Sequence, residues 1–399
     1  MDMWKDHGEE GAKGKKLPHR ILHVVDDFST GNTGVTSSVR QIAQWQAQHC
    51  DWVGVHATGP VDLPVPAGVS LILSPAHRFT SRWRYPAHGS KGLLDIVREH
   101  RVTHLHVHEF WRGGFVVAMR VAHTAGIPVV LSAHGATSPW ALYGQGWVKR
   151  IKKQAYWHLF ARHLLLSWAA LHAVTPLEQR HMRQFFGREP QAIIPNALHE
   201  IPDLMSFDGQ GPFRDRRRLV FLGRLHPVKG VDGLIQAFHR ARLRGEWELL
   251  IVGPEEIPAY AQELKDMAKE GERAGDIQFL EACHGAEKWG LLASAWVVVV
   301  PSHTEVIGMV NLEAATAGAP TITTTATGLE EWTDSGGVLI DHTLDSLIFA
   351  LEHVGNWGAM ERLRRGEQCR SYVMRKYSMD SVGREWLRFY ARLADQVRE

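Results

Sequence analysis

A chain of 399 residues is long enough for two ordinary domains, each with its own core. Hydrophobic residues make up 44% and charged residues 22%, as in globular proteins, and a formal net charge of +2 excludes a global field that attracts nucleic acid. No apolar run reaches the roughly 18 residues that span a bilayer, and the three scattered cysteines indicate neither disulfides nor zinc. We therefore expect a soluble, cytoplasmic protein.

The first half of the chain alternates short apolar runs with helical patterns. Residues 1–19 are charged and Gly-rich, and we interpret them as a mobile tail. The apolar runs predict strands at 21–25, 52–55, 102–107 and 129–132, with helices at 35–48 and 113–125. This alternation is typical of a parallel sheet with helices on both faces.

A second series of the same kind begins at residue 218. It predicts strands at 219–222, 249–252, 277–280, 297–300 and 321–323, with helices at 231–243 and 308–317. Residues 199–217 contain Pro and Gly and suit a linker. The prediction is an α/β chain with two doubly wound domains, at 20–204 and 205–377. The last segment, 378–399, is predicted as a helix, and whether it crosses back to the first domain is left open.

The segment 300–314 carries the densest set of candidate site residues. A buried strand ends there, a loop carries Glu305, and a helix begins near Gly308. Ligands bind at the carboxyl ends of parallel strands, and the free N–H groups of a helix start attract phosphate. Glu313 lies further into this helix, where a carboxylate suits sugar hydroxyls. The alternative is a capping box, Ser302-x-x-Glu305, without any ligand.

A basic pair follows another strand of the same domain. Arg224 and Lys229 lie in the loop 223–230, between a predicted strand and a predicted helix. A guanidinium fits phosphate oxygens as a planar fork, and an ammonium adds a point charge. Such cations stabilise the negative charge that develops on a departing nucleoside diphosphate. The alternative of two unconnected surface cations is disfavoured by the Glu305 segment in the same domain.

The loop after the first strand, residues 29–35, contains Gly34. It lacks the G-x-G-x-x-G spacing of dinucleotide-binding loops, and Asp51 precedes the second strand instead of ending it. We therefore favour a loop that closes on phosphates over an NAD site.

Histidines mark two strand ends in the first domain. His104, His106 and His108 alternate along one predicted strand and share a face, but no carboxylate set accompanies them, so we expect no metal and no cofactor. His108 with Glu109, and also His134, come just after predicted strand ends, where they would face a cleft between the domains. For His134 the alternative is a structural histidine bonded to a loop carbonyl.

The segment 147–168 is basic, aromatic and free of acidic residues. Its cations include Lys149, Arg150, Lys152 and Lys153, and its apolar residues at helical spacing are Val148, Ile151, Ala155 and Leu159. A helix of this composition can lie on an anionic membrane. We favour instead a helix that packs its apolar face on the core, and peripheral membrane contact stays open.

Taken together, these motifs resemble the retaining GT-B glycosyltransferases of glycosyltransferase family 4 (glycosyl transferases group 1), over about residues 20–395. Glu305 and Glu313 match the E-x7-E motif within PSHTEVIGMVNLEAATAGAP, and FLGRLHPVKG matches the GRL-x-P-x-KG element. LLIVGPEE, IIPNALHE and LHAVTPLEQR match weaker landmarks. The resemblance implies the GT-B fold, two Rossmann-like domains with an interdomain cleft.

For the C-terminal domain, the resemblance implies a role for each matched residue. Arg224 and Lys229 would hold the donor diphosphate. Glu305 would contact the donor sugar near its reacting carbon, and Glu313 would bind the nucleotide ribose. Backbone N–H groups for phosphate and sugar would come from the helix start, at Gly308, Met309 and Val310.

For the N-terminal domain, the resemblance implies that Gly34 meets the diphosphate and that His134 lies near the donor sugar and the acceptor. His108 and Glu109 are weaker acceptor-side candidates. The usual Gly-Phe after the first Glu is replaced by residues 306–307, Val-Ile, and this change reshapes the expected donor-sugar pocket.

The sequence therefore predicts a retaining, metal-independent glycosyltransferase. It would move a sugar from a nucleotide-sugar donor, UDP favoured over GDP, to a hydroxyl of a glycan or lipid-linked acceptor. Cell-surface polysaccharide or lipopolysaccharide biosynthesis is the expected setting, in the cytoplasm, with contact at the inner membrane face left open. Two alternatives remain: an inverting GT-B transferase, and a catalytically silent relative that binds nucleotide or glycan.

Overall fold

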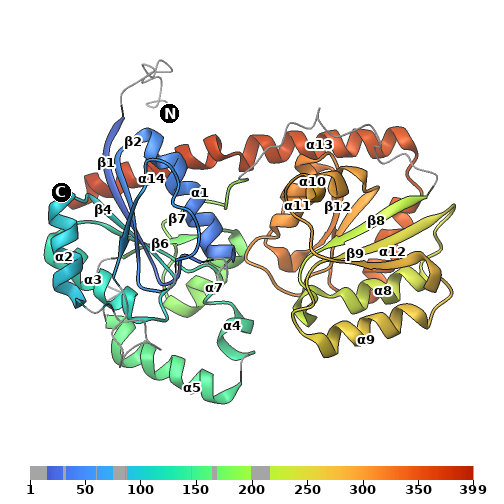
Figure 1. Cartoon of the computed structure of the whole chain (residues 1–399), viewed down its shortest axis with the longest axis horizontal. Helices are drawn as coiled ribbons and strands as arrows, with labels where there is room; N and C mark the ends of the chain where they lie inside the picture. The colour runs from blue at the N-terminus through green and yellow to red at the C-terminus, as the bar shows by residue number, and fades with distance from the viewer. Residues whose placement is uncertain are drawn as a thin grey trace. The chain divides into compact units, whose positions relative to one another are not determined.

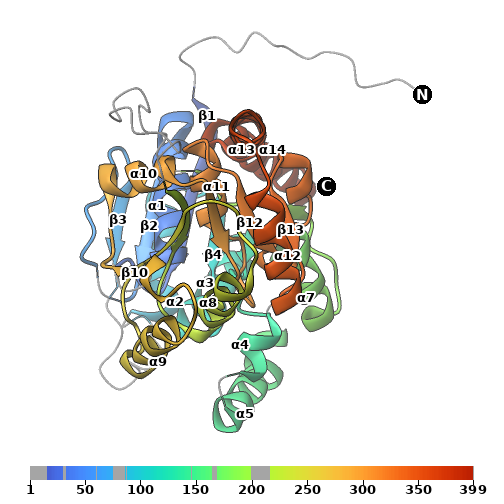
Figure 2. The ribbon, with the colours of Figure 1, turned by 90° about the vertical axis from the view of Figure 1, so that its right-hand side faces the viewer.

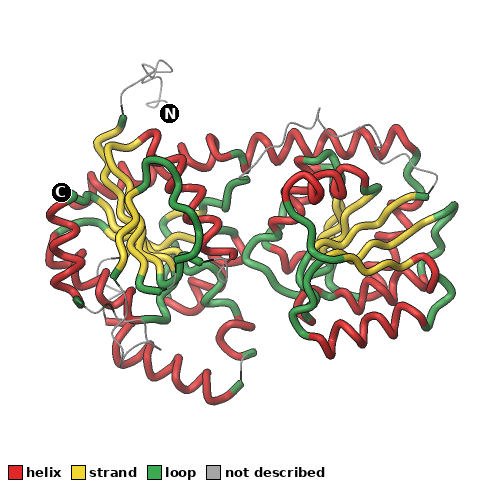
Figure 3. Tube along the Cα trace, viewed as in Figure 1, coloured by secondary structure: helices red, strands yellow, loops and turns green. Residues whose placement is uncertain are grey.

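The computed structural model describes residues 16–29, 33–59, 61–74, 86, 88–144, 146–163, 169–198 and 216–398. Residues 1–15 of the predicted tail and most of the predicted linker at 199–217 lie outside this part. Residues 17–19, also assigned to the tail, belong to the first strand. The strands form two separate sheets, and every pairing described within them is parallel (Figures 1 and 3).

The first sheet has seven strands in the order β3-β2-β1-β4-β5-β6-β7. Its strands are β1 (Leu17–Val25), β2 (Cys50–Ala57), β3 (Ser70–Leu73), β4 (His104–His108), β5 (Val129–Ser132), β6 (Ala169–Ala173) and β7 (Ala192–Ile193). The helices between them are α1 (Thr33–His49), α2 (Gly89–Glu99), α3 (Gly113–Ala125), α4 (Pro139–Tyr143), α5 (Trp147–Tyr156) with a π-helical turn at Trp157–Ala161, and α7 (Pro176–Phe186).

The second sheet has six strands in the order β10-β9-β8-β11-β12-β13. Its strands are β8 (Arg217–Leu222), β9 (Trp247–Val252), β10 (Ile277–Leu280), β11 (Val297–Val300), β12 (Thr321–Thr324) and β13 (Val338–Ile340). Its helices are α8 (Val231–Arg240), α9 (Pro258–Lys269), α10 (Gly285–Ser294), α11 (Met309–Thr316), α12 (Leu344–Gly355), α13 (Ala359–Tyr377) and α14 (Met379–Arg398).

The central strands of the second sheet are buried on both faces, which explains their unbroken apolar runs. In β8, Leu219 and Phe221 pack with α8, α9 and α12, whereas Val220 packs with α10 and α11. In β11, Val297 and Val299 face the first set of helices, and Val298 and Val300 face the second. Alternate residues of one strand therefore enter two cores, as the period of two requires.

The described residues form two compact units: residues 1–132, 151–171 and 386–399 make up the first, and residues 133–150 and 172–385 the second. α14 therefore begins in the second unit and ends in the first, where its Tyr390 carbonyl accepts a hydrogen bond from Nε2 of His104. β7 is the last strand of the first sheet and β8 the first strand of the second in chain order, and the predicted domain boundary at residue 205 lies between them in sequence. No helix in the described part is long and apolar enough to cross a bilayer.

Candidate functional site

Two loops at the carboxyl ends of neighbouring strands form the candidate site. β8 and β11 pair side by side, with β9 and β10 on one side and β12 and β13 on the other. The chain order thus reverses between β8 and β11, and open α/β sheets bind ligands at such a switch point. The loops at residues 223–230 and 301–308 leave the sheet here, so both predicted motifs lie at one edge.

The two loops are held together by their backbones. Gly230 has a φ of 66°, and a Cβ atom there would lie 2.4 Å from the carbonyl oxygen of Pro301. Only glycine combines this conformation with so close an approach. The N–H of His303 donates to the carbonyl oxygen of Val228 at 2.8 Å. The 3-10 turn that carries Lys229 is therefore fixed against the loop after β11.

Lys229 and Glu305 form an ion pair between these loops. Nζ of Lys229 lies 3.0 Å from Oε1 of Glu305, and the side chains are 20% and 15% exposed. The Ser302 hydroxyl donates to the same oxygen at 2.5 Å. The capping-box alternative is wrong, because Ser302 bonds the Glu305 side chain and helix α11 begins later, with Gly308 as its N-cap. The sequence pattern therefore places a carboxylate beside a cation.

The start of α11 is more occupied than predicted. The N–H of Gly308 donates to the carbonyl oxygen of Thr327 at 3.0 Å, and the N–H of Met309 donates to that of Ile307 at 2.9 Å. A phosphate at these two groups would have to replace protein acceptors. In the described part of the chain no backbone acceptor is found for the Val310 N–H, so this third group is the one offered directly.

The remaining charged candidates are each paired with a residue to which the sequence analysis gave no role. Arg224 donates to Oε2 of Glu256 at 2.6 Å, and both side chains are more than one third exposed. Glu313 lies 3.0 Å from Nζ of Lys288, and both are about one quarter exposed. Glu256 follows β9 and Lys288 lies in α10, so only the fold brings these partners to the site.

His134 lies just after β5 in a left-handed conformation, with a φ of 49°. Burial lowers the pKa of its largely buried imidazole from 6.5 to about 4, so the ring is neutral at neutral pH. The next residue, Gly135, donates its N–H to Glu178 at 2.5 Å, and Val174 donates to the other oxygen of that carboxylate at 2.7 Å. Glu178 thus ties the His134 loop to the end of β6.

Sequence reasoning missed Glu178, although a local signal was present. Thr175 is the N-cap of α7, its hydroxyl accepts the Glu178 N–H, and Pro176 occupies the first helical position. This Thr-Pro-x-Glu pattern is that of a capping box, in which the glutamate returns to nearby backbone N–H groups. Burial raises the pKa of Glu178, and its two N–H donors oppose that rise.

The structure gives His108 a different position from the one expected. β4 extends through residue 108 instead of ending at 107, so His108 stays on the face of His106 and is only 5% exposed. Its Nε2 lies 3.0 Å from Nδ1 of His23. The imidazole points into the sheet interior and does not present a surface to an acceptor. Glu109 follows with a φ of 66°, and its N–H donates to Ser132.

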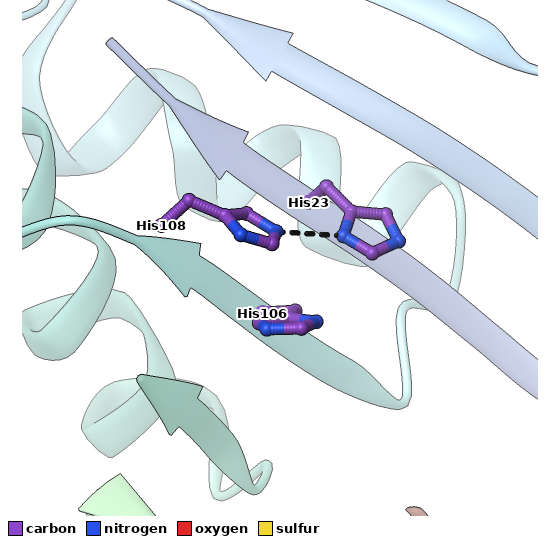
Figure 4. Close-up of side chains that lie close together, drawn as sticks. All are labelled: His23, His106 and His108. Carbon is purple, nitrogen blue, oxygen red and sulfur yellow. Dashed lines mark hydrogen bonds between the residues drawn. The ribbon is translucent and has the colours of Figure 1, made fainter. Parts of the chain in front are cut away.

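His23, His106 and His108 form a buried cluster in which one nitrogen of each ring lies within 4.8 Å of the other two (Figure 4). His106 stacks on His108 at 4.1 Å between centroids, and its two nitrogens lie next to Ser132 Oγ and Tyr390 Oη, at 2.7 and 2.8 Å. A metal binds in the plane of each imidazole ring. Stacked rings whose nitrogens meet other partners do not share such a point, so the arrangement suits a hydrogen-bonded network better than a metal site.

Gly34 lies in the first turn of α1, and a Cβ atom at this position would have no neighbour within 4 Å. The preceding Gly31 and Asn32 lie outside the described residues. The space around Gly34 agrees with a loop open to a ligand, and its contact with a diphosphate stays a prediction.

Two family models match this chain in consecutive segments. The glycosyl transferase 4-like domain matches residues 33–197, and the model named glycosyl transferases group 1 matches residues 206–350. The second match contains Arg224, Lys229, Glu305 and Glu313. The chain belongs to the group 1 glycosyl transferases.

Curated relatives of this family align over part of the chain. An uncharacterized glycosyltransferase of Methanocaldococcus jannaschii is 30% identical over 180 residues, which is 44% of this chain and 45% of the relative. The D-inositol 3-phosphate glycosyltransferase of a Nocardioides species is 28% identical over 256 residues, 57% of this chain and 54% of the relative. The chain thus spans about half the length of these two relatives.

Solved structures of low sequence identity share the fold over nearly the whole chain. Anabaena Alr3699/HepE in complex with UDP has a TM-score of 0.72 at 17% identity, covering 93% of this chain and 99% of that one. WaaG, a glycosyltransferase involved in lipopolysaccharide biosynthesis, has a TM-score of 0.66 at 18% identity, covering 94% and 99%. With the two parallel sheets, these likenesses identify the GT-B fold of the group 1 transferases.

Proposed function

We propose that this group 1 transferase moves a sugar from a nucleotide-sugar donor to an acceptor hydroxyl, with retention of the anomeric configuration. The observation that carries the proposal is the Lys229–Glu305 pair at the switch point of the second sheet. The pair is mostly buried, its carboxylate oxygen is bonded by two donors, and glycine lets the two loops touch. A surface ion pair without function needs none of these constraints.

In this proposal the cations act on the leaving group. As the bond between the sugar and the diphosphate breaks, negative charge grows on the phosphate oxygens, and a cation already in place stabilises it without reorganisation. Lys229 and Arg224 supply that charge, and the Val310 N–H adds a dipole at the helix start. Since two cations stand at the leaving group, we propose that the reaction needs no metal ion and no other cofactor.

Glu305 and Glu313 serve the sugar and the ribose in this scheme. A carboxylate accepts hydrogen bonds from hydroxyl groups, and both carboxylates keep some exposure for this purpose, at 15% and 23%. His134, neutral at working pH, can both donate to and accept from a hydroxyl near the reacting carbon. Gly34 approaches the diphosphate as backbone only.

The proposed donor is a UDP-sugar, with a GDP-sugar second. The likeness to Alr3699/HepE, a structure in complex with UDP, favours the uracil base. The proposed acceptor is a glycan or a lipid-linked glycan in cell-surface polysaccharide or lipopolysaccharide biosynthesis, supported by the likeness to WaaG, which is involved in lipopolysaccharide biosynthesis. The proposed location is the cytoplasm, and a lipid-linked acceptor would bring the protein to the inner membrane face.

A screen of nucleotide sugars tests the proposal directly. The purified chain is incubated with UDP- and GDP-sugars in EDTA, and thermal stabilisation and diphosphate release are measured. We expect one donor to raise the melting temperature and release its diphosphate in the presence of EDTA. In Arg224→Ala, turnover should fall by on the order of 10²–10³, by analogy with the loss of one charge-stabilising donor.

The same purified protein and donor also test the stereochemistry of the reaction and the two alternative functions. NMR of the product should show the anomeric configuration of the donor, whereas an inverted product would favour the inverting transferase. Binding of a nucleotide without diphosphate release from any donor would favour the catalytically silent module. Near-normal turnover of Arg224→Ala would refute the role assigned to that guanidinium.

A further inference from the structure

The helix α5 exposes its apolar face. The side chains of Trp147, Val148, Ile151 and, in the following turn, Leu159 are 75%, 46%, 55% and 68% exposed, and Ala155 between them is exposed too. The prediction that this face packs on the core is therefore wrong. The same residues recur at helical spacing, but their side chains are exposed to solvent instead of packing on a core; α5 is labelled in Figures 1 and 2.

The opposite face of this segment holds it to the protein. Tyr156 and Trp157 are buried, and the Tyr156 hydroxyl donates to the carbonyl oxygen of Arg112 at 3.1 Å. Nζ of Lys153 lies over the ring of Trp111, 5.1 Å from its centroid. The helix therefore packs on the protein along one side, and its apolar residues are exposed on the other side.

The exposed face carries more than its share of the apolar surface of the chain. The large hydrophobic residues that stay exposed in the described part include Trp140, Tyr143, Trp147, Val148, Ile151 and Leu159, all within twenty residues of sequence. Single exposed apolar residues are ordinary, whereas a contiguous group marks an interaction surface. In α5 itself the most exposed of these side chains is Trp147, and tryptophan favours the boundary between water and lipid.

The charge around this face has one sign. From residue 110 to residue 177 the chain contains no Asp or Glu, although it has 43 of them in total. The cations in the same stretch are Arg112, Arg120, Lys149, Arg150, Lys152, Lys153 and Arg162. Arg150 and Lys152 are exposed and lie beside the apolar residues in the helix. The Arg150 guanidinium also stacks on the ring of Tyr143, 4.8 Å from its centroid.

We propose that α5 is a membrane-docking helix: its exposed apolar face enters the interface of an anionic lipid bilayer while Arg150, Lys152 and their neighbours bind headgroup phosphates. A folded protein partner of acidic character would satisfy the charge but does not need an exposed tryptophan and exposed aliphatic side chains beside it. A lipid interface uses both features together, since apolar side chains enter the acyl boundary and cations meet the negative surface potential. The proposal is independent of the transferase activity.

Vesicle sedimentation tests it with the full chain. Vesicles of phosphatidylcholine and phosphatidylglycerol at 70:30 are compared with pure phosphatidylcholine at low salt. We expect strong binding to the anionic vesicles, weak binding to the neutral ones, and loss of the difference at 0.5 M NaCl, where charges are screened. Equal binding to both vesicles, or none to either, would overturn the proposal.

Paired variants assign the binding to α5. Arg150→Gln with Lys152→Gln should lower the partition coefficient about 30-fold, because each cation near an anionic surface contributes about fivefold to binding. The matched control, Lys91→Gln with Arg98→Gln on the exposed side of α2, should leave it unchanged. A control pair that lowers binding equally would show that net charge alone is responsible, and the assignment to α5 would fail.

A second pair tests the apolar face. Trp147→Ser with Ile151→Ser should lower the partition coefficient at least tenfold, whereas Phe349→Ser with Met360→Ser, which are 71% and 78% exposed elsewhere, should not. All four side chains are exposed, so the variants should melt within a few degrees of the wild type. In Trp147→Phe, vesicle binding should persist while the blue shift of tryptophan fluorescence shrinks. A blue shift that persists in this variant would place the inserted tryptophan elsewhere and refute the docking face.

Discussion

Replacement of Lys229 by Gln separates a structural ion pair from a catalytic one. The change removes the positive charge 3.0 Å from Glu305 and leaves that carboxylate with the Ser302 hydroxyl. Breaking a fully buried pair costs about 3–5 kcal/mol, and a surface pair is worth at most about 1 kcal/mol. Because the two side chains keep 20% and 15% exposure, we expect a loss of about 2 kcal/mol in the free energy of unfolding.

The expected loss in catalysis is larger than the loss in stability. A preplaced cation at a leaving diphosphate is worth on the order of 10²–10³ in turnover, or about 3–4 kcal/mol in the barrier. Turnover with the best donor is measured at 25 °C, well below melting, and stability is measured by chemical denaturation. The melting temperature should fall by about 4–8 °C, in line with about 2 kcal/mol for a domain of this size.

Turnover and the free energy of unfolding of Lys229→Gln together distinguish a catalytic role from a structural one. If Lys229→Gln loses the expected stability but keeps turnover within about threefold, the pair only joins the two loops and the leaving-group role is refuted. Glu305→Gln serves as the control for the stability arm, because it removes the same attraction from the other side. A double variant that is no less stable than either single one would show that both measure one interaction.

Three further results are expected from the same structure. Gly230→Ala should lower the free energy of unfolding by about 1–3 kcal/mol and reduce turnover, because its Cβ would meet the Pro301 carbonyl. The control Gly233→Ala in α8, where a Cβ would have no atom within 4 Å, should be neutral or stabilising. An equal loss of stability in both variants would contradict the prediction. Glu256→Gln should free Arg224 and lower the KM for the donor, and a raised KM would oppose it. Burial lowers the pKa of His23, His56 and His104 from 6.5 to about 4, so between pH 6.5 and 4 the unfolded chain binds more protons than the folded one. The free energy of unfolding should therefore fall as the pH drops from 6.5 to 4, by up to about 1.4 kcal/mol per pH unit for each group. A free energy of unfolding that does not change over this range, measured by chemical denaturation, would contradict the prediction.

The central strands of the second sheet could be predicted from sequence because they are buried on both faces. Val297–Val300 is apolar without interruption, and the predicted and observed limits coincide there and at Ile277–Leu280. Short strands such as β13 were missed, since three residues give too little pattern. Strand ends are also weakly specified: β4 runs one residue further than predicted, and that residue is His108, which thereby turns from a cleft candidate into a core side chain.

Periodicity shows that a helix has an apolar face but not what covers that face. The spacing of Val148, Ile151 and Leu159 is the same whether the helix packs on a core or on another surface, and the choice of the core was wrong. Ion-pair partners are hidden for a related reason. Glu256 and Lys288 are distant in sequence from the residues they bind. Glu256 lies in the LLIVGPEE landmark, but that pattern does not indicate its partner, and no local pattern marks Lys288.

The charge balance of the candidate site bears on how a donor would bind. Each proposed ligand group is already neutralised: Lys229 by Glu305, Arg224 by Glu256, and Glu313 by Lys288. An arriving diphosphate therefore does not meet a strongly positive pocket, and it gains attraction only where a carboxylate gives up its cation. The Arg224 pair is the most exposed of the three and is worth least in water, so it is the first to exchange. Binding of the phosphates to Arg224 would then precede the disruption of the more buried Lys229 pair, which would be reserved for the charge that develops as the sugar leaves.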